Sequence, residues 1–179
     1  MRRLLPVLIW VGTTASLAGA TLEKLGLDDM IVRSTAIVRG RAAGSYAAQH
    51  GALIYTHWRI QVTERLKGDP GAQVDVVVPG GVAGGYRQTF SGTPSLAPGT
   101  EYVLFLWTGR NGLTHMIGLS QGVLTLQTSS KGEQFAARAA ASGPMLDPRT
   151  GAPVEDEPVR ITLSALRERI RARVGTAKE

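Results

Sequence analysis

The sequence contains no cysteine, which excludes disulfide bonds, thiolate metal sites and cysteine nucleophiles. It also shows no internal repeat and no low-complexity block, and aromatic residues make up only 6% of the chain. Without disulfides, stability has to come from a hydrophobic core. A domain of this length buries roughly two thirds of its unfolded surface. The sequence therefore predicts one domain of ordinary size that is stable through its core alone.

The first 20 residues have the order of a secretory signal peptide. Arg2 and Arg3 precede an apolar stretch over residues 4–17, and the small-x-small sequence Ala18 to Ala20 follows. The alternative is a retained membrane anchor, but glycine, threonine and serine interrupt the stretch, which is shorter than the roughly 20 residues of a spanning helix. We expect a secreted or periplasmic protein that begins at Thr21 and has no stable membrane span after cleavage.

The charge after residue 20 is mildly positive, with 18 basic against 14 acidic residues. Such a balance is compatible with anionic surfaces and is too small to indicate nucleic-acid binding. The expected partner is an extracytoplasmic protein or an envelope polymer, and no nucleic acid.

Most of the chain predicts β-strands. Between Leu53 and Lys67, apolar and polar residues alternate with period two, which predicts a half-buried strand. This strand exceeds the usual length of about 5 or 6 residues, so we expect it to be bent or bulged, as in a small barrel. The apolar run over residues 102–107 predicts the central buried strand. The other predicted strands are residues 35–41, 73–78, 113–119 and 123–128.

Three segments have helical patterns: residues 22–33, the Ala-rich residues 133–142, and residues 159–175. The last has an apolar stripe through Leu163, Leu166 and Ile170, with Thr162 as a possible N-cap. We expect a mostly β fold: a small OB-like barrel of five to six strands, closed or partly open, within residues 21–142. A short N-terminal helix precedes it, residues 143–158 connect, and the C-terminal amphipathic helix packs on the barrel.

Residues 118–122, Gly-Leu-Ser-Gln-Gly, match the G-x-S-x-G pattern of a nucleophile elbow, which requires a strand-to-helix turn and a histidine base. Here the motif lies between two predicted strands. All three histidines, His50, His57 and His115, precede Ser120, whereas the α/β-hydrolase order places histidine after serine. A catalytic Ser120 is therefore disfavoured, and the sequence predicts a protein that is not an enzyme.

Metal sites in proteins require clustered ligands at suitable spacing. His50 and His57 are seven residues apart across a predicted turn, without an H-x-x-x-H pattern, so solvent-facing histidines are expected. The acidic clusters lack the calcium-loop arrangement. We expect no metal and no cofactor.

The Gly-rich residues 80–95 form the candidate binding loop. Tyr86, Arg87 and Gln88 supply aromatic, cationic and hydrogen-bonding groups on a glycine frame. The alternative is that the loop only covers one end of the barrel.

The order of several segments resembles a group of uncharacterised exported bacterial proteins. These segments are residues 36–40 (AIVRG), 64–68 (ERLKG), 79–81 (PGG), 92–94 (GTP), 98–106 (PGTEYVLFL) and 118–122 (GLSQG). More distantly, the strand plan resembles the OB-like barrels of netrin modules and tissue inhibitors of metalloproteinases. The first resemblance implies no known activity. The inhibitors use an N-terminal cysteine, which this chain lacks, so no inhibitory residue is carried over.

The expected function is that of an exported, non-enzymatic binding or accessory domain of unknown ligand. A secreted protease inhibitor or protease-associated protein is the first alternative, and a small serine hydrolase that uses Ser120 is the second.

We predict that the mature protein starts at Thr21, because Ala18 and Ala20 occupy the small positions required for cleavage. N-terminal sequencing of protein from the periplasm or the medium tests this. A chain that retains Met1 in the cytoplasm would contradict export.

Overall fold

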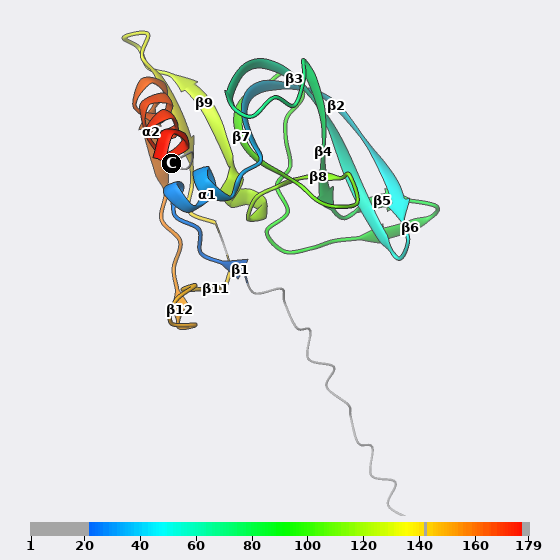
Figure 1. Ribbon diagram of the computed structural model, residues 1–179. Helices are drawn as coiled ribbons and strands as arrows, with labels where there is room; N and C mark the ends of the chain where they lie inside the picture. The colour runs from blue at the N-terminus through cyan, green and yellow to red at the C-terminus, as the bar shows by residue number, and fades with distance from the viewer. Residues whose placement is uncertain (1–21, 142, 177–179) are drawn as a thin grey trace, which may run out of the picture.

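The computed structural model describes residues 22–141 and 143–176, so the predicted signal peptide lies outside the described residues. The chain folds into an eight-stranded mixed sheet with a short N-terminal and a C-terminal helix (Figure 1). The sheet is partly closed into a ring through five strands, because the fourth of them pairs with both the first and the fifth. In chain order, the ring strands are β2 (Ala36–His50), β3 (Leu53–Lys67), β4 (Gln73–Pro79), β7 (Glu101–Thr108) and β8 (Thr114–Met116).

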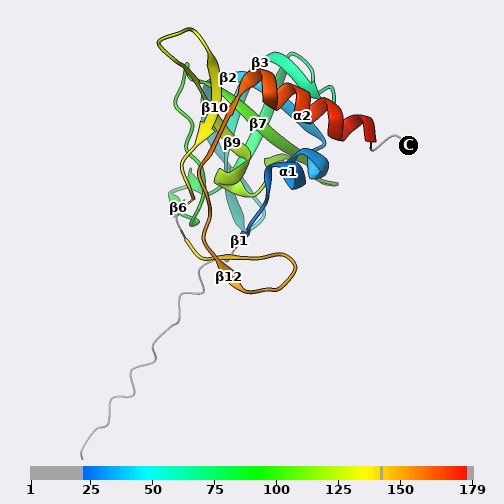
Figure 2. The same cartoon turned by 90° about the vertical axis from the view of Figure 1, so that its left-hand side faces the viewer.

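The remaining three strands of the sheet continue it beyond β7 in the order β9, β10, β13. They are β9 (Val123–Thr128), β10 (Gln134–Arg138) and β13 (Val159–Thr162). Two helices, α1 (Leu27–Arg33) and α2 (Leu163–Thr176), pack on this part of the sheet, and Figure 2 shows α2 crossing in front of it. No helix in the described ranges is long and apolar enough to span a membrane.

Short elements complete the fold. A 3-10 helix, η1 (Leu119–Gly122), lies between β8 and β9. The Gly-rich segment contains a hairpin of β5 (Gly81–Ala83) and β6 (Tyr86–Gln88). A small separate sheet contains β1 (Leu22–Glu23), β11 (Met145–Leu146) and β12 (Pro153–Val154).

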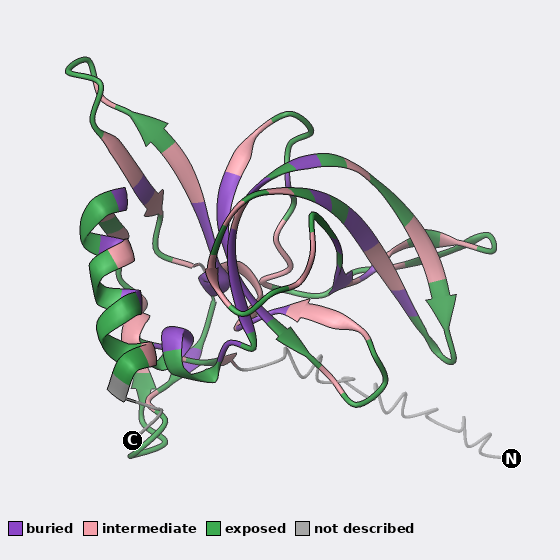
Figure 3. Ribbon diagram, turned by 45° about the horizontal axis from the view of Figure 1, so that its top comes forward, coloured by how far each residue is buried: buried purple, intermediate pink, exposed green. Residues whose placement is uncertain are grey.

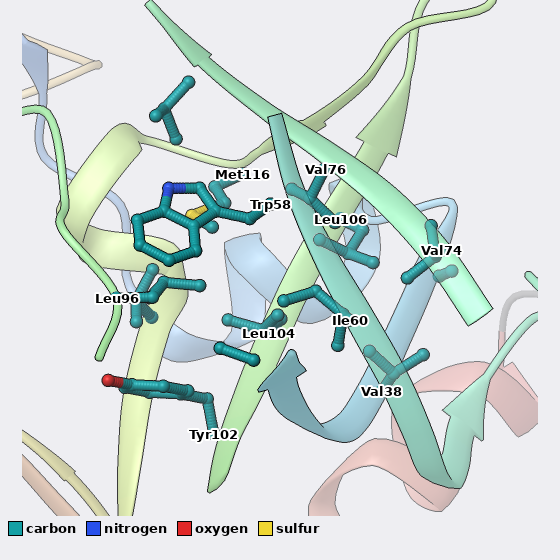
Figure 4. Packing of buried hydrophobic residues seen from close by; sticks show 14 residues of the cluster. Val38, Trp58, Ile60, Val74, Val76, Leu96, Tyr102, Leu104, Leu106 and Met116 are labelled. Atoms are coloured by element: carbon teal, nitrogen blue, oxygen red, sulfur yellow. The ribbon is translucent and has the colours of Figure 1, made fainter. Parts of the chain in front are cut away.

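Two hydrophobic cores lie on opposite faces of β7. Leu104 and Leu106 point into the strand ring, whereas Val103 and Phe105 point toward the helices. Successive side chains of a strand point to opposite faces, so a strand buried on both sides needs a continuous apolar run. Figure 4 shows the ring core, in which side chains of β2, β3, β4, β7 and β8 converge, and Figure 3 shows the burial concentrated where these strands cross.

The β2–β3 hairpin is long and irregular, as predicted for a barrel strand. Its register shifts at three points, between residues 37 and 38, 39 and 40, and 42 and 44. A Cβ on Gly40 would lie 2.6 Å from Ile60 Cγ2 and 2.8 Å from the Gln61 carbonyl oxygen. The close approach of the two strands at this bend therefore requires glycine.

Several element boundaries differ from the sequence-based predictions. The predicted helix over residues 133–142 is wrong, because Gln134–Arg138 forms β10 between β9 and β13. This pairing on both sides overrides the helical propensity of alanine. The predicted strand over residues 35–41 continues to His50, and the one over residues 113–119 ends at Met116, where η1 follows.

The C-terminal helix begins at Leu163 rather than at residue 159, since Val159–Thr162 is paired with β10. Thr162 caps it, because its hydroxyl accepts a hydrogen bond of 3.2 Å from the Ala165 backbone N–H. Asp28 of α1 forms ion pairs with Arg169 and Arg173 of α2. The hydrogen bonds from these two arginines lower the pKa of Asp28 to about 2.

The substitution Phe105→Ala tests the second core. Phe105 is fully buried, so we expect a loss of about 3 to 5 kcal/mol in the free energy of unfolding. Trp58→Ala, in the ring core, should give a loss of the same order. Chemical denaturation measures both, with Val32→Ala as the control, because Val32 is 58% exposed and should change stability by less than about 0.5 kcal/mol. Unchanged midpoints in both core variants would contradict the assigned cores.

Candidate functional site

The most distinctive surface of the protein is a row of rings on the outer face of the strand ring. Trp58 and Met116 point into the ring core, so their neighbours His57 and His115 point outward. Strand pairing places these outward residues side by side. Across β2, β3, β4, β8 and β7, the aligned positions are Tyr46, His57, Val77, His115 and Trp107.

Six aromatic and imidazole rings contact one another in sequence along this face, which we call the ring row. Centroid distances are 4.6 Å for Tyr46 and His57, 5.3 Å for His57 and His50, and 5.8 Å for His50 and Tyr55. They are 5.9 Å for Tyr55 and His115 and 5.0 Å for His115 and Trp107. The ring row therefore contains all three histidines of the chain, together with two tyrosines and a tryptophan.

The expectation of solvent-facing histidines is wrong for His57, which is only 5% exposed. Tyr46 stacks on its ring at an interplanar angle of 15°, and His50 packs against it. Both covering residues come from β2, which pairs with β3 in the long hairpin. Burial of His57 therefore depends on strand pairing and not on its own position in the alternating pattern.

Asp75 of β4 holds the inner part of the ring row by hydrogen bonds. Its Oδ2 lies 2.9 Å from His57 Nδ1 and accepts a 3.0 Å hydrogen bond from the Tyr46 hydroxyl. The hydrogen bond to Asp75 raises the pKa of Tyr46, and burial lowers the pKa of His115. Arg59 of β3 lies opposite Asp75 of β4 in the strand register, so residues of both charges flank the rings.

The ends of the ring row are open to solvent. Tyr46 is 48% exposed and Trp107 is 46% exposed. At the Trp107 end, the row continues into a groove of about 660 Å³ that Trp107, His115, Leu22 and Leu119 help to line, with Arg33 among its walls. This volume falls within the roughly 300 to 1,000 Å³ of ligand pockets.

The predicted binding loop lies elsewhere, on the β5–β6 hairpin and the segment after it. Tyr86 is 72% exposed and Arg87 is exposed, so both side chains are accessible. Gln88 has a structural role, because its amide oxygen accepts a 2.7 Å hydrogen bond from Ile54 N–H and its amide nitrogen donates to Ala52 O. Leu96, just after the loop, is part of the ring core.

The same segment roofs a small cavity of about 230 Å³ at the mouth of the strand ring. Trp58 lies at its base, and its buried indole N–H has no hydrogen-bond partner among the described residues. Residues of the segment 80–95 therefore line a cavity next to the ring core, and binding by the loop stays a prediction.

Ser120 lies in η1, with its backbone N–H bonded to Gly92 O at 3.2 Å. It lines a groove of about 430 Å³ together with Thr93, Thr125 and Arg138, and no histidine is among the described residues that line this groove. The neighbouring Gln121 is fully buried. Its side chain accepts a 2.8 Å hydrogen bond from Leu25 N–H and donates one of 3.0 Å to Glu23 O.

The backbone conformation of this motif requires glycine at two positions. Gly118 has a positive φ of 58°, and a Cβ on Gly122 would lie 2.4 Å from Ile117 O. The G-x-S-x-G match is thus explained by a tight turn that attaches the N-terminal segment through Gln121.

Within residues 22–141 and 143–176, no group of three or more His, Asp or Glu side chains has the geometry to hold a metal ion. No protein-family model, curated protein or solved structure matches the chain. The resemblances to exported bacterial proteins and to netrin-type barrels therefore stay predictions.

Sequence reasoning missed the ring row, although one signal was present. A hairpin with its turn at residues 51 and 52 would pair Tyr46 with His57 and Ala48 with Tyr55, as observed. Treating residues 35–41 as a complete strand removed Tyr46 and His50 from consideration.

The motif is tested by comparing Gln121→Ala with Ser120→Ala. Loss of the Gln121 amide leaves the buried Leu25 N–H without its acceptor, which should lower the free energy of unfolding by about 1 to 3 kcal/mol. Ser120→Ala should change it by less than about 0.5 kcal/mol. Chemical denaturation compares the two variants, and equal losses would contradict the structural account of the motif.

Proposed function

We propose that the protein is an exported, non-enzymatic binding domain with an OB-like barrel, and that the ring row is its contact surface for a carbohydrate polymer of the cell envelope. The observation that carries the proposal is the unbroken series of five contacts among six rings on an open face of the strand ring.

The scaffold supports this proposal. OB-folds are five-stranded, partly open barrels, and they bind oligosaccharides and oligonucleotides on the face of their second and third strands. In the present ring, the second and third strands in chain order are β3 and β4. These strands carry Tyr55, His57 and Asp75, which lie in or support the ring row.

The chemistry of the face favours a neutral polymer over a polyanion. Asp75 and Arg59 have opposite charges, and the lowered pKa of His115 keeps its imidazole neutral near pH 7. Half-exposed aromatic rings offer flat apolar area with polar edges, which suits amphipathic partners. Sugar rings combine an apolar face with hydroxyl groups that Tyr46 and Asp75 could hydrogen-bond.

The shape of the surface favours an elongated ligand. The ring row runs across all five strands of the ring, four of which supply its rings, and continues into the 660 Å³ groove beside Trp107. A single small molecule would occupy only part of this surface. A polymer strand could contact the rings and place one terminal or branching group in the groove.

The two alternative functions have less support. The hydrolase alternative needs a base beside Ser120, whereas all three histidines lie in the ring row. The protease-inhibitor alternative rests on a fold-level resemblance alone.

Co-sedimentation with purified peptidoglycan sacculi tests the proposed function. The double variant Tyr46→Ala with Trp107→Ala removes two exposed aromatic rings of the row. Loss of two aromatic contacts with a bound ligand costs about 2 kcal/mol or more in total, so we expect binding to weaken by at least about 30-fold.

The matched control is Tyr86→Ala with Arg87→Ala, which removes an exposed aromatic group and a cation from the predicted binding loop. This variant should bind like the unsubstituted chain. Loss of binding in the loop variant with full retention in the row variant would assign the contact to the loop. Absence of sedimentation by the unsubstituted chain would reject the envelope glycan as ligand.

A further inference from the structure

The ring row contains one pair of side chains whose reactive atoms face each other. His50 Nε2 lies 3.1 Å from His57 Nε2, and the ring planes are inclined by 30°. Two imidazole nitrogens at this separation either share one proton or bind one cation. The groups that surround the two rings determine whether the pair can bind a cation.

Asp75 and Tyr46 define the orientation of the inner histidine. Asp75 Oδ2 lies 2.9 Å from His57 Nδ1, and because a carboxylate only accepts, Nδ1 carries the proton. The tautomer of His57 with its proton on Nδ1 has the Nε2 lone pair on the side of His50. Metal-binding histidines in proteins almost always have such a carboxylate or carbonyl acceptor at the other ring nitrogen.

The Nε2 separation is compatible with coordination to one ion. At metal–nitrogen distances of about 2.0 Å, two neighbouring ligand nitrogens are about 3.3 Å apart in a tetrahedral site and about 2.8 Å apart in a square-planar site. The observed 3.1 Å lies between these values.

The position of the pair in the hairpin allows an ion to enter. His57 is held in the middle of β3 and is 5% exposed, whereas His50 is the exposed last residue of β2, next to the turn at Gly51. Ala48 lies between Tyr46 and His50 on the same face, and its small side chain leaves room for the His50 ring to reach back to His57.

We propose that His50 and His57 form a two-histidine site for a borderline transition-metal ion, with Cu²⁺ bound more tightly than Zn²⁺, and that Asp75 positions His57 for it. No third His, Asp or Glu ligand joins them within the described residues, so water or a group of the bound partner completes the coordination. Imidazole nitrogen suits both ions, and the order of affinity follows the general stability order of divalent metals.

The site does not depend on the proposed polymer, so it is tested with Cu²⁺ alone. The full chain, purified without a polyhistidine tag, is titrated with one equivalent of Cu²⁺ and its electron paramagnetic resonance spectrum is recorded. We expect superhyperfine splitting from two nitrogen ligands, and a weaker complex of the same stoichiometry with Zn²⁺.

The variants separate this site from other copper ligands. His50→Gln changes an exposed residue and should remove the two-nitrogen signal, whereas the matched variant His115→Gln, in the same row, should retain it. Asp75→Asn should weaken Cu²⁺ binding by about 10- to 100-fold without abolishing it. Far-UV circular dichroism checks that each variant is folded.

A two-nitrogen spectrum in His50→Gln equal to that of the unsubstituted chain would overturn the proposal, as would its absence from the unsubstituted chain. Failure to bind sacculi would not affect either result, since the titration contains no polymer.

Discussion

The structure depends on the burial of β2 and β7 on both faces. The two strands are neighbours, and their side chains alternate between the ring core and the helix-covered core. Val38 and Leu104 belong to the first core, and Ile37 and Phe105 to the second. A chain without disulfides has to obtain its stability from such burial. Because β2 and β7 each contribute side chains to both cores, a domain of modest length can build two cores.

The same constraint leaves one face of the ring available for function. The outer faces of β2 and β7 near their paired segment, and the end of β3 that carries Leu66, pack against the core covered by α1 and α2, whereas His57, Val77 and His115 of β3, β4 and β8 lie outside that core (Figure 1). The outward rings of the row pack against one another. That is where the rings and Asp75 gather, on a surface whose backbone is held rigid by strand pairing from both sides.

The local sequence pattern was enough to predict those strands that are defined by their own alternation and by the turns that flank them. Leu53–Lys67 and Val123–Thr128 were identified with the observed bounds, because alternation and flanking turns are properties of the segment itself.

The strand Gln134–Arg138 was not predicted, since alanine favours helices and only the pairing with β9 and β13 makes the segment a strand. The burial of His57 and the role of Gln121 were missed for the same reason, because each depends on partners 7 to 98 residues away. Tyr86 and Arg87, which were predicted to lie in a binding loop, are exposed on the β5–β6 hairpin, but Gln88 was not recognisable as a side chain that anchors it.

The contact between α1 and α2 has a consequence for how the chain acquires its structure during synthesis. The second core combines Met30 and Ile31 with Leu163, Leu166 and Ile170, and Asp28 meets its two arginines only when α2 is present. A ribosome makes residues 163–173 after all the strands of the sheet, so α2 cannot cover the outer face of β7 until those strands have been synthesised. The strand ring can form earlier, but the second core is complete only after the residues of α2 have been made. Until then the surface formed by Ile37, Val103 and Phe105 lacks the cover that α2 provides, and transiently exposed apolar surface of this kind favours aggregation.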